Sequence, residues 1–117
     1  MISARKDCAQ ARMTVEQRHL NGGNVCQGGA LFTLADLASA AACNSEGHLA
    51  LSISETINFH KSGLLGDVLT ADAHVEVEGG KLPYCAVRIT NQEGEIIATF
   101  SGLSYRKDVK LPIDDIV

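Results

Sequence analysis

One carboxylate stands in an otherwise apolar stretch of the sequence. From Gly28 to Asn44 the residues are mainly Leu, Phe and Ala, and Asp36 is the one side chain there that is normally charged at pH 7. Burying an unpaired carboxylate is costly, so Asp36 must face solvent, hydrogen-bond a hydroxyl such as that of Thr33 or Ser39, or line a cavity. In a cavity it could act as a general base or nucleophile with a raised pKa.

A glycine pair, Gly28 and Gly29, precedes this carboxylate at the predicted start of a helix. The first N–H groups of a helix have no partner within it, and glycine leaves them open to an anion or a polarised carbonyl oxygen. An oxyanion hole has this geometry. A tight loop-to-helix transition also favours small residues, so the pair alone leaves both interpretations open.

The spacing of the two features limits how they could cooperate. Eight residues at about 1.5 Å each separate Gly28 from Asp36 by roughly 12 Å along one helix. One reacting carbonyl group cannot touch both. If two helices ran antiparallel across a two-fold axis, Gly28 of one subunit would lie near Asp36 of the other. The spacing therefore predicts an obligate dimer or higher oligomer with shared sites.

Periodicity indicates the elements that would position these groups. The residues from Gly29 to about Asn44 predict one helix, with Gly47 as its C-cap. Alternating residues predict one strand before the helix and four after it in a meander: 9–20, 49–61, 68–78, 82–90 and 96–107. Turns are expected at 63–67, 79–80 and 91–94. A helix that is apolar all round needs cover, so the sheet should wrap around it in one α+β domain, residues 1–117.

Composition excludes several function classes. The formal charge is −4 and Lys and Arg form no run, which argues against nucleic-acid binding. The four cysteines show neither a CxxC motif nor metal-ligand spacing, so no metal site is expected. The first residues lack the apolar segment of a signal peptide, and no apolar run is long enough to span a bilayer. A cytoplasmic protein without membrane contact is expected.

Two quoted stretches resemble a known family. HLNGGNVCQGGALFTLADLASAAACNSEG, followed by INFHKSGLLGDVLTADAHV, is similar to the single-hotdog acyl-CoA thioesterases. The branch is that of phenylacetate degradation, whose signature is approximately N-x(6)-G-G-x-x-F-x-L-A-D. The resemblance runs from about residue 9 to residue 107. It implies a hotdog fold, in which an antiparallel sheet wraps a long central helix, and a homodimer or a dimer of dimers.

The resemblance also implies roles for particular residues. Asp36 would activate water or attack the thioester carbonyl, the Gly28 N–H would polarise the carbonyl oxygen, and Asn21 would orient the water or the thioester. Coenzyme A would enter only as part of substrate and product, and no cofactor is expected. Further candidates for substrate contact are Gly29 at the helix start, Ser52, which aligns with a hydroxyl that some members use, and His60 at the turn after the central strand.

Gln27 departs from the family pattern, which has His at this position. Gln can donate a hydrogen bond and so position a loop or a carbonyl group, but it does not gain or lose a proton near neutral pH. Activity is expected to survive, with an altered rate or substrate choice. The expected pocket rim differs from the family pattern at a second place, where Lys61-Ser62-Gly63 replaces the usual Pro after the central strand.

The resemblance implies hydrolysis of aryl- or short- and medium-chain acyl-CoA, and three other functions are possible for such a sequence. A hotdog hydratase would need a His at position 41, which is Ala41. A non-catalytic acyl-CoA binding or sensing module would explain Gln27, but it gains little from a buried Asp36. A nucleophilic Cys26 lacks a clear His partner, and buried cysteine often behaves as a small hydrophobic residue.

Overall fold

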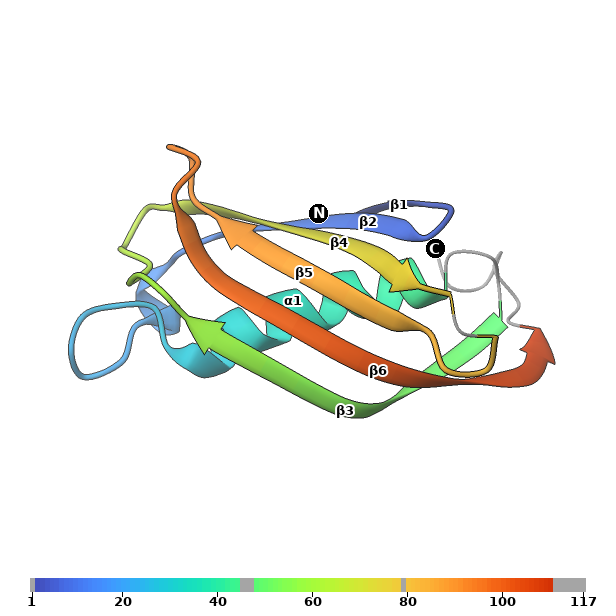
Figure 1. The fold of residues 1–117 in the computed structure, drawn as a ribbon. Coiled ribbons are helices and arrows are strands. Elements are labelled where there is room, and N and C mark those ends of the chain that lie inside the picture. The colour runs from blue at the N-terminus through green and yellow to red at the C-terminus, as the bar shows by residue number, and fades with distance from the viewer. Residues whose placement is uncertain (1, 45–47, 79, 111–117) are drawn as a thin grey trace.

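One α-helix lies across one face of a six-stranded antiparallel sheet (Figure 1). The computed structural model describes residues 2–44, 48–78 and 80–110. In these ranges the elements are β1 (Ile2–Arg5), β2 (Cys8–Thr14), a short 3-10 helix (Gln17–His19), α1 (Gly28–Cys43), β3 (His48–Phe59), β4 (Val68–Val77), β5 (Tyr84–Thr90) and β6 (Ile96–Lys110). The sheet order is β1-β2-β4-β5-β6-β3. This is the α+β architecture expected from the sequence.

Helix α1 begins and ends within one residue of its predicted bounds. Gln27 is its N-cap, with extended backbone, and Asn44 is its C-cap. The Asn44 side chain donates to the Ala40 carbonyl at 2.7 Å, which closes the last turn. Gly47, the predicted C-cap, lies outside the described residues. Asparagine therefore performs the capping that the sequence suggested for glycine.

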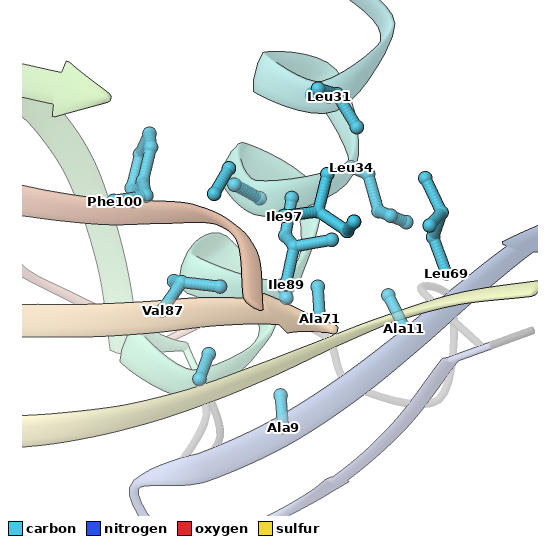
Figure 2. Packing of buried hydrophobic residues seen from close by; sticks show 14 of the residues in the cluster. Ala9, Ala11, Leu31, Leu34, Leu69, Ala71, Val87, Ile89, Ile97 and Phe100 are labelled. Carbon is cyan, nitrogen blue, oxygen red and sulfur yellow. The ribbon is translucent and has the colours of Figure 1, made fainter. Parts of the chain in front are cut away.

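The core fills the space between α1 and the sheet (Figure 2). Leu31 and Leu34 project from the helix toward Leu69, Ile89 and Ile97 of the sheet. Small residues, including Ala35, Ala38, Ala9, Ala11 and Ala71, let the helix approach the strands closely. The core is mainly aliphatic, which agrees with an aromatic content of only 4% and the absence of Trp from the sequence.

The order of the strands differs from the expected meander. Strands β4, β5 and β6 are consecutive neighbours, but β3 pairs with β6 at one edge and β4 pairs with β2. Strand β1, which pairs with β2, was not predicted. Alternation reports where a strand lies but not which strands pair, because pairing depends on contacts far apart in sequence.

Among the described residues, helix α1 is covered by the sheet on one side only. The face that carries Leu37 points away from the sheet, and this side chain is 45% exposed. The expectation of cover on most sides is therefore not met by one chain. Both edges of the sheet, β1 and β3, are also open (Figure 1).

The predicted turns are present where the structure describes them. Gly94 has a φ of +78°, and the Asn91 side chain accepts the N–H groups of Glu93 and Glu95. Asp67 accepts the Leu64 N–H at 2.9 Å and so closes the turn before β4. The hairpin predicted at 79–80 lies partly outside the described residues, but β4 and β5 pair as it requires.

Candidate active site

Three segments meet at the N-terminal end of α1. The loop that leads into the helix, the helix start, and the chain that follows β3 lie at the same end of the molecule (Figure 1). The Cys26 N–H donates to the Gly63 carbonyl at 2.7 Å, and the Gln27 N–H donates to the His19 carbonyl at 2.8 Å. These backbone bonds fix the direction from which the chain enters the helix.

Gly28 is the first residue of α1. Within the described chain its N–H donates to no backbone carbonyl, as expected for the first turn of a helix. A Cβ atom at this position would stand 2.9 Å from Cζ of Phe59 on β3. The Phe59 ring, which is exposed, would have to shift to admit a larger residue, and the N–H remains available to a ligand.

A groove of about 370 Å³ opens beside this N–H group. The lining is mainly apolar with one cationic side chain: Val25, Cys26, Gly28, Leu31, Phe59, His60, Lys61 and Ser62. His60 thus borders a groove, where the sequence suggested it, and its Nε2 lies 2.8 Å from the Thr99 hydroxyl. Lys61 forms an ion pair with Glu95 at the rim.

Asn21 and Gln27 belong to the loop that leads into α1, although neither lines the groove. The Asn21 Oδ1 atom accepts the Gly23 N–H at 2.8 Å, so the side-chain oxygen holds the loop and the NH2 group is the part able to donate to a ligand. Gln27 is exposed and its side chain makes no capping hydrogen bond to the helix. Gly29, also exposed, follows in the first turn.

Asp36 lies two turns further along α1 and is half-buried. It shares a side of the helix with Phe32, whose ring meets that of Phe100 edge-on at a centroid distance of 5.5 Å. Asp36 therefore faces β6 and β3. Because Gly28 is at the start of the same rigid helix, one chain does not bring these two residues together.

Glu55 on β3 is a site residue that the sequence interpretation missed. Its carboxyl group neighbours Asp36 of α1 and Ser52 of its own strand, and both influence its ionisation. Burial, and then the neighbouring Asp36, raise the pKa of Glu55 to about 7. A signal was present, because strict alternation places Glu55 in a row with Ile53 and Ile57, where an acid is as unusual as Asp36 is in the helix. The structure thus joins Asp36, Glu55 and Ser52.

The described residues give little support to a cysteine nucleophile or a metal site. Cys26 is buried, and that burial raises the pKa of its thiol, which opposes a nucleophilic role. In the part of the chain that the structure describes, no three His, Cys, Asp or Glu side chains are grouped to hold a metal ion. Nor do the described residues include a helix long and apolar enough to cross a membrane.

Comparison with known proteins gives consistent matches. Residues 19–98 match the family model of the thioesterase superfamily. The acyl-coenzyme A thioesterase PaaI of Escherichia coli K12 is 42% identical over 106 residues, which are 91% of this chain and 76% of that protein.

Solved structures agree over nearly the whole chain. The structure of E. coli PaaI, from the phenylacetic acid degradation operon, superposes with a TM-score of 0.88 at 40% identity, covering 91% of this chain and 77% of that one. A Streptococcus mutans UA159 protein bound to acetyl-CoA gives a TM-score of 0.88 at 29% identity, covering 93% and 87%. A hypothetical thioesterase of Streptococcus pneumoniae TIGR4, solved with coenzyme A, gives 0.86 at 28% identity, covering 93% and 94%.

Proposed function

The chain belongs to the thioesterase superfamily, whose members hydrolyse thioesters and share the hotdog fold, and we propose that it hydrolyses acyl-CoA to a free acid and coenzyme A. The observation that carries the proposal is the pairing, on one helix, of an unpartnered Gly28 N–H that opens on a groove with the half-buried carboxyl group of Asp36. Thioester hydrolysis needs these two functions, an oxyanion donor and a base or nucleophile.

Asp36 starts the reaction by one of two routes. As a general base, it takes a proton from water while the water oxygen attacks the thioester carbonyl carbon. As a nucleophile, its own oxygen attacks and forms an anhydride that water then hydrolyses. On both routes the carbonyl oxygen gains negative charge, the Gly28 N–H donates to it, and coenzyme A leaves as a thiolate that takes up a proton. In this proposal the amide groups of Asn21 and Gln27, from the loop before the helix, help to orient the water or the thioester.

A second copy of the chain completes each site. Asp36 and Gly28 are roughly 12 Å apart along α1, too far to act on one carbonyl group. The open edge of β3 exposes Leu51 and Ile53, which are 48% and 57% exposed, and the uncovered face of α1 exposes Leu37. Pairing of two β3 edges about a two-fold axis covers these side chains and sets the helices antiparallel. A homodimer and a dimer of dimers both contain this interface.

The groove favours a compact acyl group with coenzyme A attached. Phe59 and Leu31 line it with apolar surface that fits an aryl or a short- to medium-chain acyl group. Gly29, Ser52 and His60 lie around the proposed path of the substrate. The relatives named for, or solved with, coenzyme A compounds support this substrate class. The four cysteines are free thiols, which supports a cytoplasmic location.

Release of free coenzyme A from a panel of aryl-, short- and long-chain acyl-CoAs tests the proposal. Chromatography is the suitable detection, because thiol dyes also label the four cysteines. We expect turnover in the wild type and a loss of at least a hundredfold in Asp36→Ala with an unchanged oligomeric state. Asp72→Asn, on the exposed face of β4, is the matched control. Binding without hydrolysis would instead favour the non-catalytic acyl-CoA module suggested by Gln27.

A further inference from the structure

Glu55 points from β3 toward the helix that carries Asp36. Its pairing partner on the neighbouring strand β6 is Gly102. A Cβ atom placed at Gly102 would stand 3.6 Å from the Glu55 Cγ and 3.7 Å from the Ser39 Oγ of α1. The Glu55 side chain therefore enters the space between helix and sheet over a glycine. Ser39 is one helical turn after Asp36, on the same side of α1.

The Glu55 carboxyl group is poorly suited to carry a charge in this position. Its Oε2 atom is enclosed and has no hydrogen-bond partner among the described residues. An enclosed, unpartnered carboxylate oxygen costs more free energy when it is ionised than when it is protonated. Asp36, the neighbouring side chain from α1, is itself an acid, and two adjacent carboxyl groups resist ionising together.

We propose that Glu55 is a positioning residue that shares a proton with Asp36: in its protonated form it donates a hydrogen bond that holds the Asp36 carboxylate in its reactive orientation. This inference rests on the proposed function, in which Asp36 acts on a thioester. Loss of the Glu55 proton places two negative charges side by side, and Asp36 then turns away from the reacting carbonyl group. The enzyme thus loses activity as Glu55 ionises.

The surroundings of Glu55 set the pH at which this happens. Burial is the largest cause of its raised pKa of about 7, Asp36 raises it further, and a hydrogen bond with Ser52 opposes both. These groups come from α1 and from β3, while β6 presents the uncharged Gly102. The proton is therefore lost near neutral pH, within the range in which the enzyme can be assayed.

Measurement of kcat and KM against pH in three variants distinguishes a positioning role of Glu55 from a packing role. Glu55→Gln keeps a donor that does not titrate, so we expect near wild-type kcat at pH 6 and a decline above pH 7 that is absent or moved upward by at least one pH unit. Glu55→Leu keeps the volume without a donor, and should lower kcat roughly ten- to a hundredfold at every pH with KM within about threefold. Glu76→Gln, on the exposed face of β4, should match the wild type. Coincident profiles of wild type and Glu55→Gln would overturn the proposal.

A titration followed by 13C NMR of the side-chain carboxyl groups tests the shared proton without any substrate. The Glu55 signal, assigned by its loss in Glu55→Gln, should titrate near pH 7 in the wild type and about one unit lower in Asp36→Asn, which removes the neighbouring charge. Titration of Glu55 at an ordinary acidic pH in both proteins contradicts the inference. If the titration shifts as expected but no acyl-CoA is hydrolysed, the carboxyl pair stands and the proposed function is what fails.

Discussion

At the scale of single residues, the proposed chemistry rests on two neighbouring acids, Asp36 and Glu55. Each acid lies among apolar residues in the sequence, one on the helix and one on β3, and the fold brings the two acids together. A lone buried carboxylate costs folding free energy, whereas a pair that holds one proton carries one charge and has an internal hydrogen bond. Burial, and then the neighbouring Asp36, raise the pKa of Glu55.

This pair should make the stability of the protein depend on pH. The folded state raises the pKa of Glu55 from 4.5 to about 7, so between these values the folded protein binds more protons than the unfolded chain. The free energy of unfolding therefore falls as pH rises through this window and levels off above it. The full shift is worth roughly 3 kcal/mol at 1.36 kcal/mol per pH unit, and partial exposure of Glu55 lowers this to about 1–2 kcal/mol.

Urea unfolding of the wild type and of Glu55→Gln, at pH 4 and at pH 8 and at one fixed protein concentration, measures this effect. Glu55→Gln should be more stable relative to the wild type at pH 8 than at pH 4, by about 1–2 kcal/mol. The fixed concentration matters because an oligomer gains stability by mass action. An equal difference at both pH values would show that Glu55 titrates alike in the folded and unfolded states.

Gln27 offers a residue-scale test of the departure from the family pattern. The helix start is capped through the Gln27 backbone, and its side chain is exposed and makes no capping bond. Gln27→Ala should therefore change the free energy of unfolding by less than about 0.5 kcal/mol. If its amide binds the thioester, KM should rise about fivefold, the equivalent of one hydrogen bond, with little change in kcat.

Steady-state kinetics and thermal unfolding of Gln27→Ala and Gln17→Ala check this prediction. Gln17 is an exposed glutamine of the 3-10 helix before the loop and should affect neither measurement. A loss of stability greater than about 1 kcal/mol in Gln27→Ala would mean that the side chain supports the loop.

Asp36 and Gly28 could be predicted from the sequence because each breaks a local rule: an acid in an apolar helix, and a glycine at a helix start. The role of Asn21 in its own loop could not be predicted, because its oxygen accepts N–H groups that come together only in the folded turn. Glu55 also breaks a local rule, but strand β3 has a bulge between Ser52 and Ser54. That bulge changes which side chains face inward, so the alternation alone is ambiguous.

At the scale of the elements, the start of α1 is the part of the site whose role can be isolated. Gly28 is the first helical residue, a position that accepts proline because its N–H has no helical partner. Gln27, with φ −65° and ψ 146°, already has the extended backbone that a following proline requires. Gly28→Pro should therefore leave α1 intact while it removes the proposed oxyanion donor.

Gly28→Ala is the matched control, since alanine and proline both place a Cβ atom against Phe59 but alanine keeps the N–H. We expect kcat for acyl-CoA hydrolysis to be roughly a hundred- to a thousandfold lower in Gly28→Pro than in Gly28→Ala. Circular dichroism should show that both variants retain the helix. Equal kcat values in the two variants would exclude the Gly28 N–H as the oxyanion donor.

The sequence predicted where the helix and strands lie better than it predicted which strands pair. Helix α1 and most strands follow from local periodicity, whereas the pairing of β3 with β6 depends on residues about 40 positions apart, such as Ile57 and Phe100. Strand β1 is short, and its residues lack a clear alternation before the tight turn at Asp7, which has a φ of +58°. Such long-range and turn-dependent features are the ones that periodicity does not encode.

At the scale of the whole molecule, the proposed mechanism requires two chains to form two complete sites. If Gly28 of one subunit serves Asp36 of the other, mutations of these two residues in different chains should complement each other. A heterodimer of an Asp36→Ala chain and a Gly28→Pro chain has one site with both residues intact and one with both changed. Random assortment makes about half of the dimers mixed, so the mixture should regain about a quarter of wild-type activity although each parent is inactive.

Mixing the two variants in urea, refolding them together and measuring release of coenzyme A tests this arrangement. The double variant Asp36→Ala/Gly28→Pro, mixed equally with the wild type, is the control. Its mixed dimers contain no intact shared site, so activity should fall to about a quarter, below the half expected from dilution alone. A mixture of the single variants that stays inactive, together with a control that keeps half of the activity, would place each site within one chain. Gly28 and Asp36 would then have to act separately, because the helix that connects them is too long for both to reach one carbonyl group.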